Sequence, residues 1–217
     1  MAKKLTKGVF ITFEGPEGSG KSTQSNRLYE DLLSRGYDTV HTLEPGGTPL
    51  GVKIRDILLG KEEIGLVAEA ELFLFEADRA QHVQEVILPA LEAGKVVICD
   101  RFNTATFAYQ GAGLGMDIKI VEGVDRMSTG ELCPDLTILL DVEVETGLKR
   151  AGAEHTPDRM EKRSRDFHQR VRRGYLDIAE KAPDRIKVIR VAEDINETYN
   201  LVKDEVYALI ERYKGAE

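Results

Sequence analysis

The sequence predicts an α/β fold in which a five-stranded parallel sheet is flanked by helices on both faces. Two observations lead to this prediction. One is that five short strand-like segments, most of them apolar, occur along the chain. The other is that segments of helical periodicity separate them, and this alternation is typical of a doubly wound sheet with right-handed crossovers. No repeat, low-complexity tract or linker interrupts it, so residues 1–217 are expected to form one domain.

The predicted strands are short, and most of them are largely apolar. A continuous apolar run such as residues 96–99 is expected of a strand that is covered on both faces. The predicted strands comprise residues 9–13, 38–43, 96–99, 136–140 and 186–191. Apolar residues at helical spacing predict helices directly after residue 20, at residues 52–59, at residues 68–91 and from residue 195 onward. Pro89 is expected to bend the last turns of the third of these helices.

The composition restricts the class of protein. With 41% hydrophobic and 31% charged residues, the chain is expected to be soluble and globular. Its formal net charge of −8 argues against broad binding to nucleic acid or to an anionic membrane. No window approaches 18 apolar residues and no apolar segment precedes residues 9–13, so neither a membrane span nor a signal peptide is expected. Cys99 and Cys133 are too few for a disulfide framework, so we expect a reducing, cytoplasmic location.

The segment after the first predicted strand matches the phosphate-binding motif G-x-x-x-x-G-K-[ST]. Its glycines let successive backbone N–H groups converge on an anion, and the following helix adds its positive N-terminal end. Lys21 is expected to reach the β- and γ-phosphates of a nucleotide, and Ser22 to bind Mg²⁺. A glycine-rich turn with a chance lysine is the alternative. The predicted ATP-binding loop comprises Gly15, Pro16, Glu17, Gly18, Ser19, Gly20, Lys21, Ser22 and Thr23.

Polar residues that follow the other strands are the next candidates, because ligands bind beyond the carboxyl ends of parallel strands. Asp100 follows an apolar strand, as does the acidic residue that helps to hold Mg²⁺ in phosphate-loop enzymes. Its neighbour Arg101 can pair with a phosphate through two parallel hydrogen bonds. A surface ion pair at the strand end is the alternative for these two residues. Asp141 and Asp194 are interpreted more simply as the starts of helices.

Several segments together resemble the thymidylate kinases, and the resemblance covers nearly the whole chain. They are the phosphate loop, Glu44-Pro45-Gly46-Gly47-Thr48, residues 75–79, Asp100-Arg101-Phe102, Ala108-Tyr109-Gln110-Gly111, Pro134-Asp135-Leu136-Thr137 and Gly147-Leu148-Lys149-Arg150. The Glu-Pro-Gly-Gly-Thr and Ala-Tyr-Gln-Gly segments are more specific than the phosphate loop, which many nucleoside triphosphatases share. The resemblance implies the phosphate-loop nucleoside monophosphate kinase fold, phosphorylation of dTMP to dTDP with ATP and Mg²⁺, a homodimer, and a short mobile lid at about residues 151–160.

The same resemblance implies roles for individual residues. Lys21 and the loop amides would hold the ATP phosphates, while Ser22 and Asp100 would support the metal. Arg101 and Arg55 resemble the pair that clamps the dTMP phosphate. The residues that the resemblance places around the deoxyribose and thymine are Glu17 for the 3′-hydroxyl, Phe75 for base stacking, Arg79 for the exocyclic oxygen, and Thr106, Tyr109 and Gln110.

Periodicity alone leaves other interpretations open for three of these residues. Phe75 has the spacing of a core residue. Arg79 could form an ion pair with Glu76 or Glu85 on an exposed helix face, which would add little stability. Arg55 could be a solvated helix residue. The four histidines have no ligand spacing and are interpreted as structural or surface residues.

The sequence departs from the family pattern in the lid. Members with glycine at the position of Gly18 usually supply arginines from a mobile loop, but the eight residues after Arg150 contain none. Arg150 and Arg159, which flank that segment, are the candidates for neutralising charge on the transferred phosphoryl group. Arg163 and Arg165 are further candidates for this role, but a hydrated helix face is their expected place.

Two alternative functions remain open from the sequence. One is a kinase for another nucleoside monophosphate, although a purine would need a wider base site. The other is a nucleotide-dependent binding protein, although the Asn-Lys-x-Asp segment with which GTPases recognise guanine does not occur. The intact set of Lys21, Ser22, Asp100 and Arg101 conflicts with an inactive scaffold.

Overall fold

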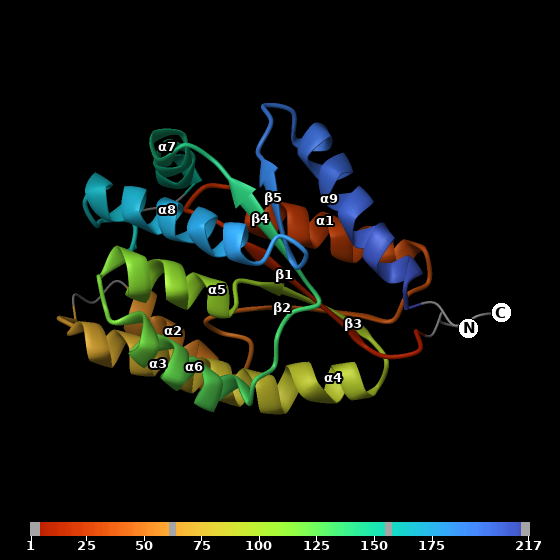
Figure 1. The fold of residues 1–217 in the computed structure, drawn as a ribbon, viewed down its shortest axis with the longest axis horizontal. Coiled ribbons are helices and arrows are strands. Elements are labelled where there is room, and N and C mark those ends of the chain that lie inside the picture. The colour runs from red at the N-terminus through yellow and green to blue at the C-terminus, as the bar shows by residue number, and fades with distance from the viewer. Residues whose placement is uncertain (1–4, 61–63, 155–157, 214–217) are drawn as a thin grey trace.

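Five parallel strands form one sheet in the computed structural model, which describes residues 5–60, 64–154 and 158–213 (Figure 1). In order across the sheet they are β2 (Thr39–Leu43), β3 (Val96–Asp100), β1 (Val9–Glu14), β4 (Leu136–Asp141) and β5 (Ile186–Arg190). All four pairings are parallel. The predicted fold class is confirmed, and each predicted strand agrees with the observed one to within one residue at either end.

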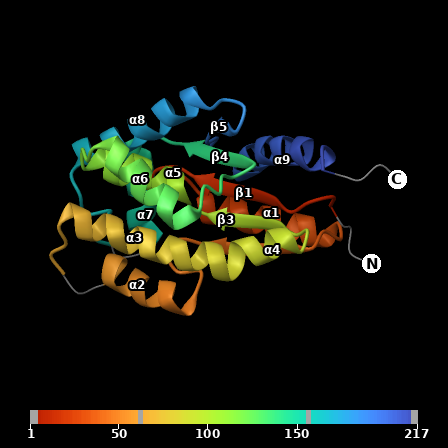
Figure 2. The ribbon, with the colours of Figure 1, turned by 60° about the horizontal axis from the view of Figure 1, so that its bottom comes forward.

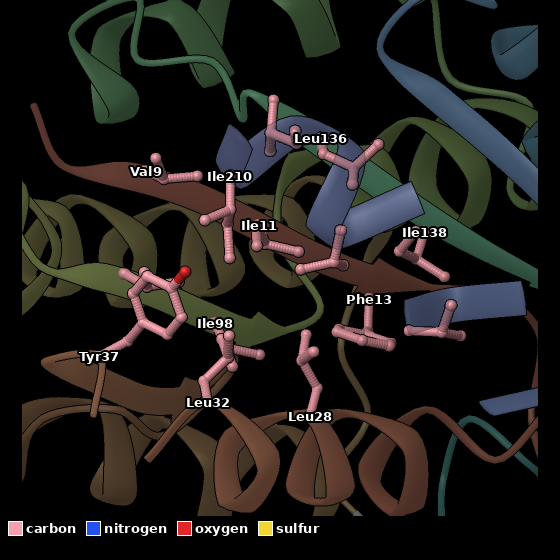
Figure 3. Packing of buried hydrophobic residues seen from close by; sticks show 14 of the residues in the cluster. Val9, Ile11, Phe13, Leu28, Leu32, Tyr37, Ile98, Leu136, Ile138 and Ile210 are labelled. Carbon is pink, nitrogen blue, oxygen red and sulfur yellow. The ribbon is translucent and has the colours of Figure 1, made fainter. Parts of the chain in front are cut away.

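One face of the sheet is covered by α1 (Lys21–Ser34) and α9 (Ile195–Glu211), which come from opposite ends of the chain. Alternate residues of β1, namely Val9, Ile11 and Phe13, are completely buried on this face (Figure 3). They pack against leucines of α1 and aliphatic side chains of α9. Because this packing holds α1 against β1, the phosphate loop between them is anchored at both of its ends.

The opposite face is covered by helices from the middle of the chain. The helices between β2 and β5 are α2 (Pro49–Leu59), α3 (Ala68–His82), η1 (Val83–Ile87), α4 (Leu88–Glu92), α5 (Asn103–Thr106), η2 (Phe107–Gly113), α6 (Ile118–Thr129), α7 (Val144–Glu154) and α8 (Arg165–Lys181). Phe10 of β1 packs against η1 and α4 on this face, while η2 and α8 pack against β4 and β5. Figure 2 shows α2, α3 and α6 side by side.

The predicted helix at residues 68–91 is present but is not uniform. It runs through α3, η1 and α4 without a break, and η1 is a π-helical segment. Pro89 is the second residue of α4, which follows η1 directly. An ordinary α-helical turn is unfavourable before a proline, because proline has no N–H and its ring meets the carbonyl four residues earlier. The chain accommodates Pro89 by a change of helix type, which the periodicity does not indicate.

Of the two aspartates interpreted as helix starts, only Asp194 caps a helix. Its side chain accepts a hydrogen bond from the backbone N–H of Asn196 at 2.8 Å, at the start of α9. Asp141 is the last residue of β4, and α7 begins only at Val144. The Asp141 carboxylate accepts two hydrogen bonds from Arg172 of α8, at 2.7 and 2.9 Å. The interpretation of Asp141 as a helix start is therefore wrong, because a long-range ion pair uses its oxygens.

Further expectations concern cysteines, membrane spans and the lid. Cys99 and Cys133 are both free thiols. Across the described ranges, every helix is too short or too polar to cross a membrane. Residues 155–157, in the middle of the predicted lid at 151–160, lie outside the described residues.

Candidate functional site

A cavity of about 520 Å³ opens at the carboxyl ends of the strands. The phosphate loop lines it, together with residues that follow β2, β3 and β5 and with side chains of α2, α3 and η2. All the predicted site residues line it except Gly15, Pro16 and Arg159. The fold thus brings side chains as distant in sequence as Glu17 and Thr198 around one space.

The phosphate loop joins β1 to α1 in a conformation that glycine permits. Gly20 is the residue before α1 and has a φ of +87°, in the left-handed region. Lys21 folds back over the loop, and its Nζ donates hydrogen bonds to the carbonyl oxygens of Gly15 at 3.0 Å and Pro16 at 2.8 Å. Burial lowers the pKa of Lys21 to about 8, and the positive charge of Arg101 acts in the same direction. A polyphosphate bound here would add negative charge beside this ammonium group.

Gly18 is in direct contact with α7. A Cβ atom at Gly18 would lie 2.0 Å from the carbonyl oxygen of Gly147, and one at Gly147 would lie 2.2 Å from that of Glu17. The two backbones therefore touch, and no side chain fits between them. The loop has no room for a basic side chain at Gly18, so additional positive charge for a nucleotide must come from other elements.

Ser22 and Asp100 meet at the wall of the cavity. The Ser22 hydroxyl donates a hydrogen bond to Asp100 Oδ2 at 2.5 Å, and both residues line the cavity. A hydroxyl and a carboxylate beside a phosphate-binding loop are hard oxygen ligands of the kind that Mg²⁺ prefers, with phosphate oxygens and water as its other ligands. The residues present therefore fit the metal that the sequence predicts.

Arg101 turns back toward the phosphate loop. Its φ of +70° lies in the left-handed region, which costs a residue other than glycine roughly 1–2 kcal/mol. Its Nη2 donates to both carboxylate oxygens of Glu17 at 2.9 Å, and the Tyr109 hydroxyl donates to the same carboxylate at 2.6 Å. Burial alone would raise the pKa of Glu17, but the charges of Arg101 and then Lys21 outweigh it and lower the pKa to about 2. The guanidinium group that the sequence assigns to a phosphate thus binds an internal anion.

Glu14 is a buried carboxyl group beside Arg101 to which no motif points. It ends β1 and accepts hydrogen bonds from the backbone N–H of Phe102 at 2.8 Å and from the Tyr175 hydroxyl at 3.0 Å. Arg101 Nη1 donates to the same tyrosine oxygen at 3.4 Å. Burial raises the pKa of Glu14 to about 7, although the charge of Arg101 lowers it in part. A carboxyl group at the end of an otherwise apolar strand is the sequence feature that could have indicated it.

Arg79 is 2% exposed and lies in an ionic network at the cavity wall. Its Nε donates to Glu44 Oε2 at 2.9 Å, and its Nη1 donates to Thr106 Oγ1 at 2.8 Å and to Glu76. Burial acts to lower the pKa of Arg79, but the charges of Glu76 and then Glu44 raise it. The alternative of an ion pair on an exposed helix face is therefore wrong, because Arg79 and Glu76 are paired but both are buried.

Phe75 and Arg55 line the cavity from α3 and α2. Phe75 is half-buried, unlike Leu72 one turn earlier, which belongs to the core. Core packing therefore does not account for Phe75. Arg55 Nη1 donates to the carbonyl oxygen of Pro45 at 2.7 Å, in the Glu-Pro-Gly-Gly-Thr segment. Arg55 is exposed but tied to the cavity wall, so it is not simply a solvated helix residue.

The arginines near the predicted lid lie in different places. Arg150, in α7, lines the cavity. Arg159 and Arg163 instead donate to one oxygen of Glu71, Oε2, at 2.6 and 2.8 Å. The expectation of a hydrated helix face is wrong for Arg163, which precedes α8 and binds a buried carboxylate. Arg165 is exposed, as expected.

A cluster of potential metal ligands lies in the core behind the cavity. One ligand atom each of Glu44, His82 and Cys99 lie within 4.8 Å of one another. These atoms are already hydrogen-bonded within the protein. His82 Nδ1 is 2.8 Å from Glu44 Oε1, His82 Nε2 is 2.7 Å from Thr42 Oγ1, and Cys99 donates to the carbonyl oxygen of Arg101. A structural role for His82, as the sequence predicts, accounts for this arrangement.

Residues that follow β5 line the far end of the cavity, and no motif identifies them. They include Val191, Ala192 and Glu193. The Gln24 side chain donates to the carbonyl oxygen of Ile195 at 3.2 Å, which ties this end of the cavity to α1. Their only sequence feature is their position after the last strand.

Known proteins resemble this chain over nearly its whole length. The family model described as thymidylate kinase matches residues 13–202. A thymidylate kinase of Desulfovibrio desulfuricans is 50% identical over 192 residues, which cover 85% of this chain and 88% of that protein. A thymidylate kinase of Ectopseudomonas mendocina is 47% identical over 203 residues, which cover 94% of this chain and 95% of that protein. The crystal structure of thymidylate kinase from Ehrlichia chaffeensis superposes with a TM-score of 0.75 at 37% identity, covering 92% of this chain and 98% of that one.

Proposed function

The chain belongs to the thymidylate kinase family, and we propose on that premise how its residues transfer the γ-phosphoryl group of ATP to dTMP, giving dTDP and ADP. One observation carries the assignment of residues. Lys21 of the phosphate loop and the acceptor candidates Arg55, Phe75 and Arg101 line one cavity, so a donor phosphate and an acceptor phosphate can meet in it. These relatives do not favour a kinase for another nucleoside monophosphate or a nucleotide-dependent binding protein.

On the donor side, the loop amides and Lys21 bind the ATP phosphates. Ser22 and Asp100 would hold Mg²⁺, which when bound neutralises charge on the β- and γ-phosphate oxygens. The adenine would lie beyond β5, where Val191 and Ile195 line the cavity. The donor tail would then run along the loop toward Arg101.

On the acceptor side, Arg101 exchanges an internal anion for a substrate anion. It binds Glu17 in the structure, and the dTMP phosphate would take over that paired hydrogen bonding together with Arg55. Glu17 would then be released to accept the 3′-hydroxyl. Phe75 stacks on thymine and Arg79 donates to its exocyclic oxygen. The remaining residues of the base and sugar pocket are Thr106, Tyr109 and Gln110.

The protein does not need a strong general base for this reaction. The attacking atom is a phosphate oxygen of dTMP, which is largely ionised near neutral pH because the second pKa of a phosphate monoester is about 6. The protein contributes in-line positioning and compensation of the charge on the equatorial oxygens.

We assign that compensation to Arg150. It lines the cavity, whereas Arg159 would have to leave Glu71 to reach the transferred phosphoryl group. The helix that carries Arg150 also touches the phosphate loop at Gly18, where the loop itself has no basic residue. Closure of the lid at about residues 151–160 would exclude water from the reaction.

We also propose that the enzyme is a cytoplasmic homodimer. Its free thiols fit a reducing compartment. Large apolar side chains are exposed on three helices that lie side by side, and a second copy would cover them (Figure 2). They are Leu50, Val52 and Ile57 of α2, Phe73 of α3, and Ile118, Ile120 and Met127 of α6.

ADP release from ATP and Mg²⁺, measured against a panel of nucleoside monophosphates, tests the reaction. We expect dTMP to have the highest kcat/KM. A preference for a purine monophosphate would support the other kinase. No turnover with any monophosphate, together with a nucleotide-dependent change in affinity for a protein partner, would support the binding protein.

Alanine substitution of Arg150 and Arg159 tests the assignment of the lid. Because a charge-compensating arginine contributes to the transition state, Arg150→Ala should lower kcat by about 10³-fold or more while changing both KM values little. Arg159→Ala should have the smaller effect on kcat. The reverse order would assign the compensating charge to Arg159.

A further inference from the structure

Glu71 is a fully buried carboxylate where three parts of the molecule meet. Oε1 accepts a hydrogen bond from Gln110 Nε2 of η2 at 2.9 Å. Oε2 accepts hydrogen bonds from Arg159 Nη1 at 2.6 Å and Arg163 Nη2 at 2.8 Å, in the segment between α7 and α8. Glu71 does not itself line the cavity. From its position outside the cavity, Glu71 therefore connects the segment between α7 and α8 to Gln110 of the acceptor pocket.

Gln110 is the link between Glu71 and the cavity, because it binds Glu71 and is itself one of the residues that line the cavity. A carboxylate has no hydrogen to donate, so the Gln110 amide must present its NH₂ group to Glu71. The opposite orientation would place two acceptors at 2.9 Å. Within the described residues, Gln110 Oε1 accepts no hydrogen bond. The carbonyl oxygen is therefore the group that remains for a ligand.

A carbonyl oxygen in the base pocket discriminates between pyrimidines. Thymine carries a hydrogen on N3, whereas N3 of cytosine is a second acceptor. An acceptor that faces N3 can bind thymine or uracil through a hydrogen bond, but it would leave two acceptors opposed in a buried site with cytosine. The orientation of one amide thus decides which bases fit.

We propose that Glu71 is a positioning residue for base selection, which holds the Gln110 amide with its carbonyl oxygen toward the base. The proposal rests on the assignment of the dTMP pocket above and extends it to a residue outside the cavity. Arg159 and Arg163 donate hydrogen bonds to the same carboxylate, so its buried negative charge is paired.

Both arginines are themselves held in place. Arg159 Nε donates to the carbonyl oxygen of Leu58 at 2.9 Å, at the end of α2. The Arg163 guanidinium group lies 4.9 Å from the ring centroid of Phe167 in α8. The two arginines that bind Glu71 are thus anchored to α2 and α8. They hold the carboxylate in one orientation, in which Oε1 accepts the hydrogen bond from Gln110.

Glu71→Gln tests the proposal, because an amide of the same shape can donate as well as accept and so permits both orientations of Gln110. The measurement is kcat/KM for dTMP and for dCMP at saturating ATP. We expect the dTMP-to-dCMP ratio to fall about tenfold or more, with little change in KM for ATP. The ratio does not depend on the fraction of enzyme that is folded. Glu69→Gln, the same substitution at an exposed position of α3, should leave it unchanged.

Two further variants separate positioning from folding. Gln110→Leu removes the amide, so it should lower the same ratio, and Glu71→Gln should have no further effect in that background. If Glu71→Gln does not fold, Glu71→Gln/Arg163→Gln removes one charge of each sign and should show the same fall. An unchanged ratio in folded Glu71→Gln, or in Gln110→Leu, would overturn the proposal. A wild-type enzyme that does not prefer dTMP to dCMP would instead contradict the proposed function.

Discussion

The two ends of the cavity are built in different ways. The site for the donor phosphates is one contiguous segment, the phosphate loop at residues 15–23, whose backbone and Lys21 form the binding surface. The acceptor end is assembled from α2, α3, η2 and the residues after β3, and buried ion pairs such as Arg79 with Glu44 hold it together. The geometry of a contiguous loop is set by its own backbone conformation, whereas the geometry of an assembled pocket depends on how distant elements pack. Substitutions at the donor end should therefore change turnover alone, and those at the acceptor end should change stability as well.

The largest effect on stability is expected at Arg79. Arg79→Met removes the guanidinium group that pairs with the buried carboxylates of Glu44 and Glu76, and removal of one member of a buried ion pair costs about 3–5 kcal/mol. The free energy of unfolding, measured by urea titration, should fall by that amount. Adding Glu76→Gln to this variant removes one of the uncompensated charges and should restore part of the loss. A loss below about 1 kcal/mol would mean that the acceptor end does not depend on its ion pairs.

At the donor end, Lys21→Ala should lower kcat by about 10²–10³-fold, because it removes a charge that stabilises the transferred phosphoryl group. Its hydrogen bonds to other described residues go to carbonyl and hydroxyl oxygens rather than to carboxylates. We therefore expect the free energy of unfolding to change by less than about 1 kcal/mol. Lys53→Ala, at an exposed position of α2, is the matched control. Equal losses of turnover and stability in Lys21→Ala would remove the distinction between the two ends.

The smallest expected effect concerns Glu14 and Glu17. They lie close together in the chain, but their pKa values are shifted in opposite directions. Burial raises the pKa of Glu14 from 4.5 to about 7, so the folded protein keeps a proton that the unfolded chain releases. The proton bound to Glu14 therefore stabilises the folded state at low pH, and this stabilisation is lost as the pH rises from about 4.5 to 7. The lowered pKa of Glu17, about 2, gives a contribution that is lost as the pH falls from about 4.5 to 2.

Glu14→Gln should remove only the first of these two effects. Urea titrations between pH 3 and pH 8 would measure the difference in unfolding free energy between variant and wild type. That difference should change by roughly 3 kcal/mol at most between pH 4.5 and 7, and should be constant below pH 4.5. Asp78 and Asp125, whose pKa values burial also raises to about 6, contribute equally to both proteins and cancel. A difference that is constant over the whole range would show that Glu14 is ionised throughout.

Features of this fold whose determinants are local can be predicted from the sequence. The strands and the phosphate loop depend on neighbouring residues, and all five strands were predicted to within one residue. The acceptor end was identified only through resemblance, because periodicity places Phe75 in the core and Arg79 on an exposed helix face. A pattern along one helix shows which residues share a face. It does not show that Glu44, from another element, lies 2.9 Å from Arg79.

Other features of the site depend on contacts between distant segments, which the sequence does not indicate. Glu71 meets Arg159 and Arg163 across 88 and 92 residues of chain. Asp141 was misinterpreted because Arg172, 31 residues later, binds both of its oxygens. The residues after β5 are indicated by the sequence only through their position at the end of a strand, and α9 and the sheet bring them to the cavity.

Gly18 and Gly147 have no side chains, so their backbones touch, and this contact sets the distance between α7 and the phosphate loop. Gly147 and Arg150 lie one turn apart on α7, so the helix rests on the phosphate loop close to the arginine that faces the cavity. With no side chain between the two backbones, nothing there can deform to absorb a change. A single methyl group at either glycine would act as a spacer that lifts α7 away from the loop. Every reacting group would still be present, but the arginine would reach the nucleotide from farther away.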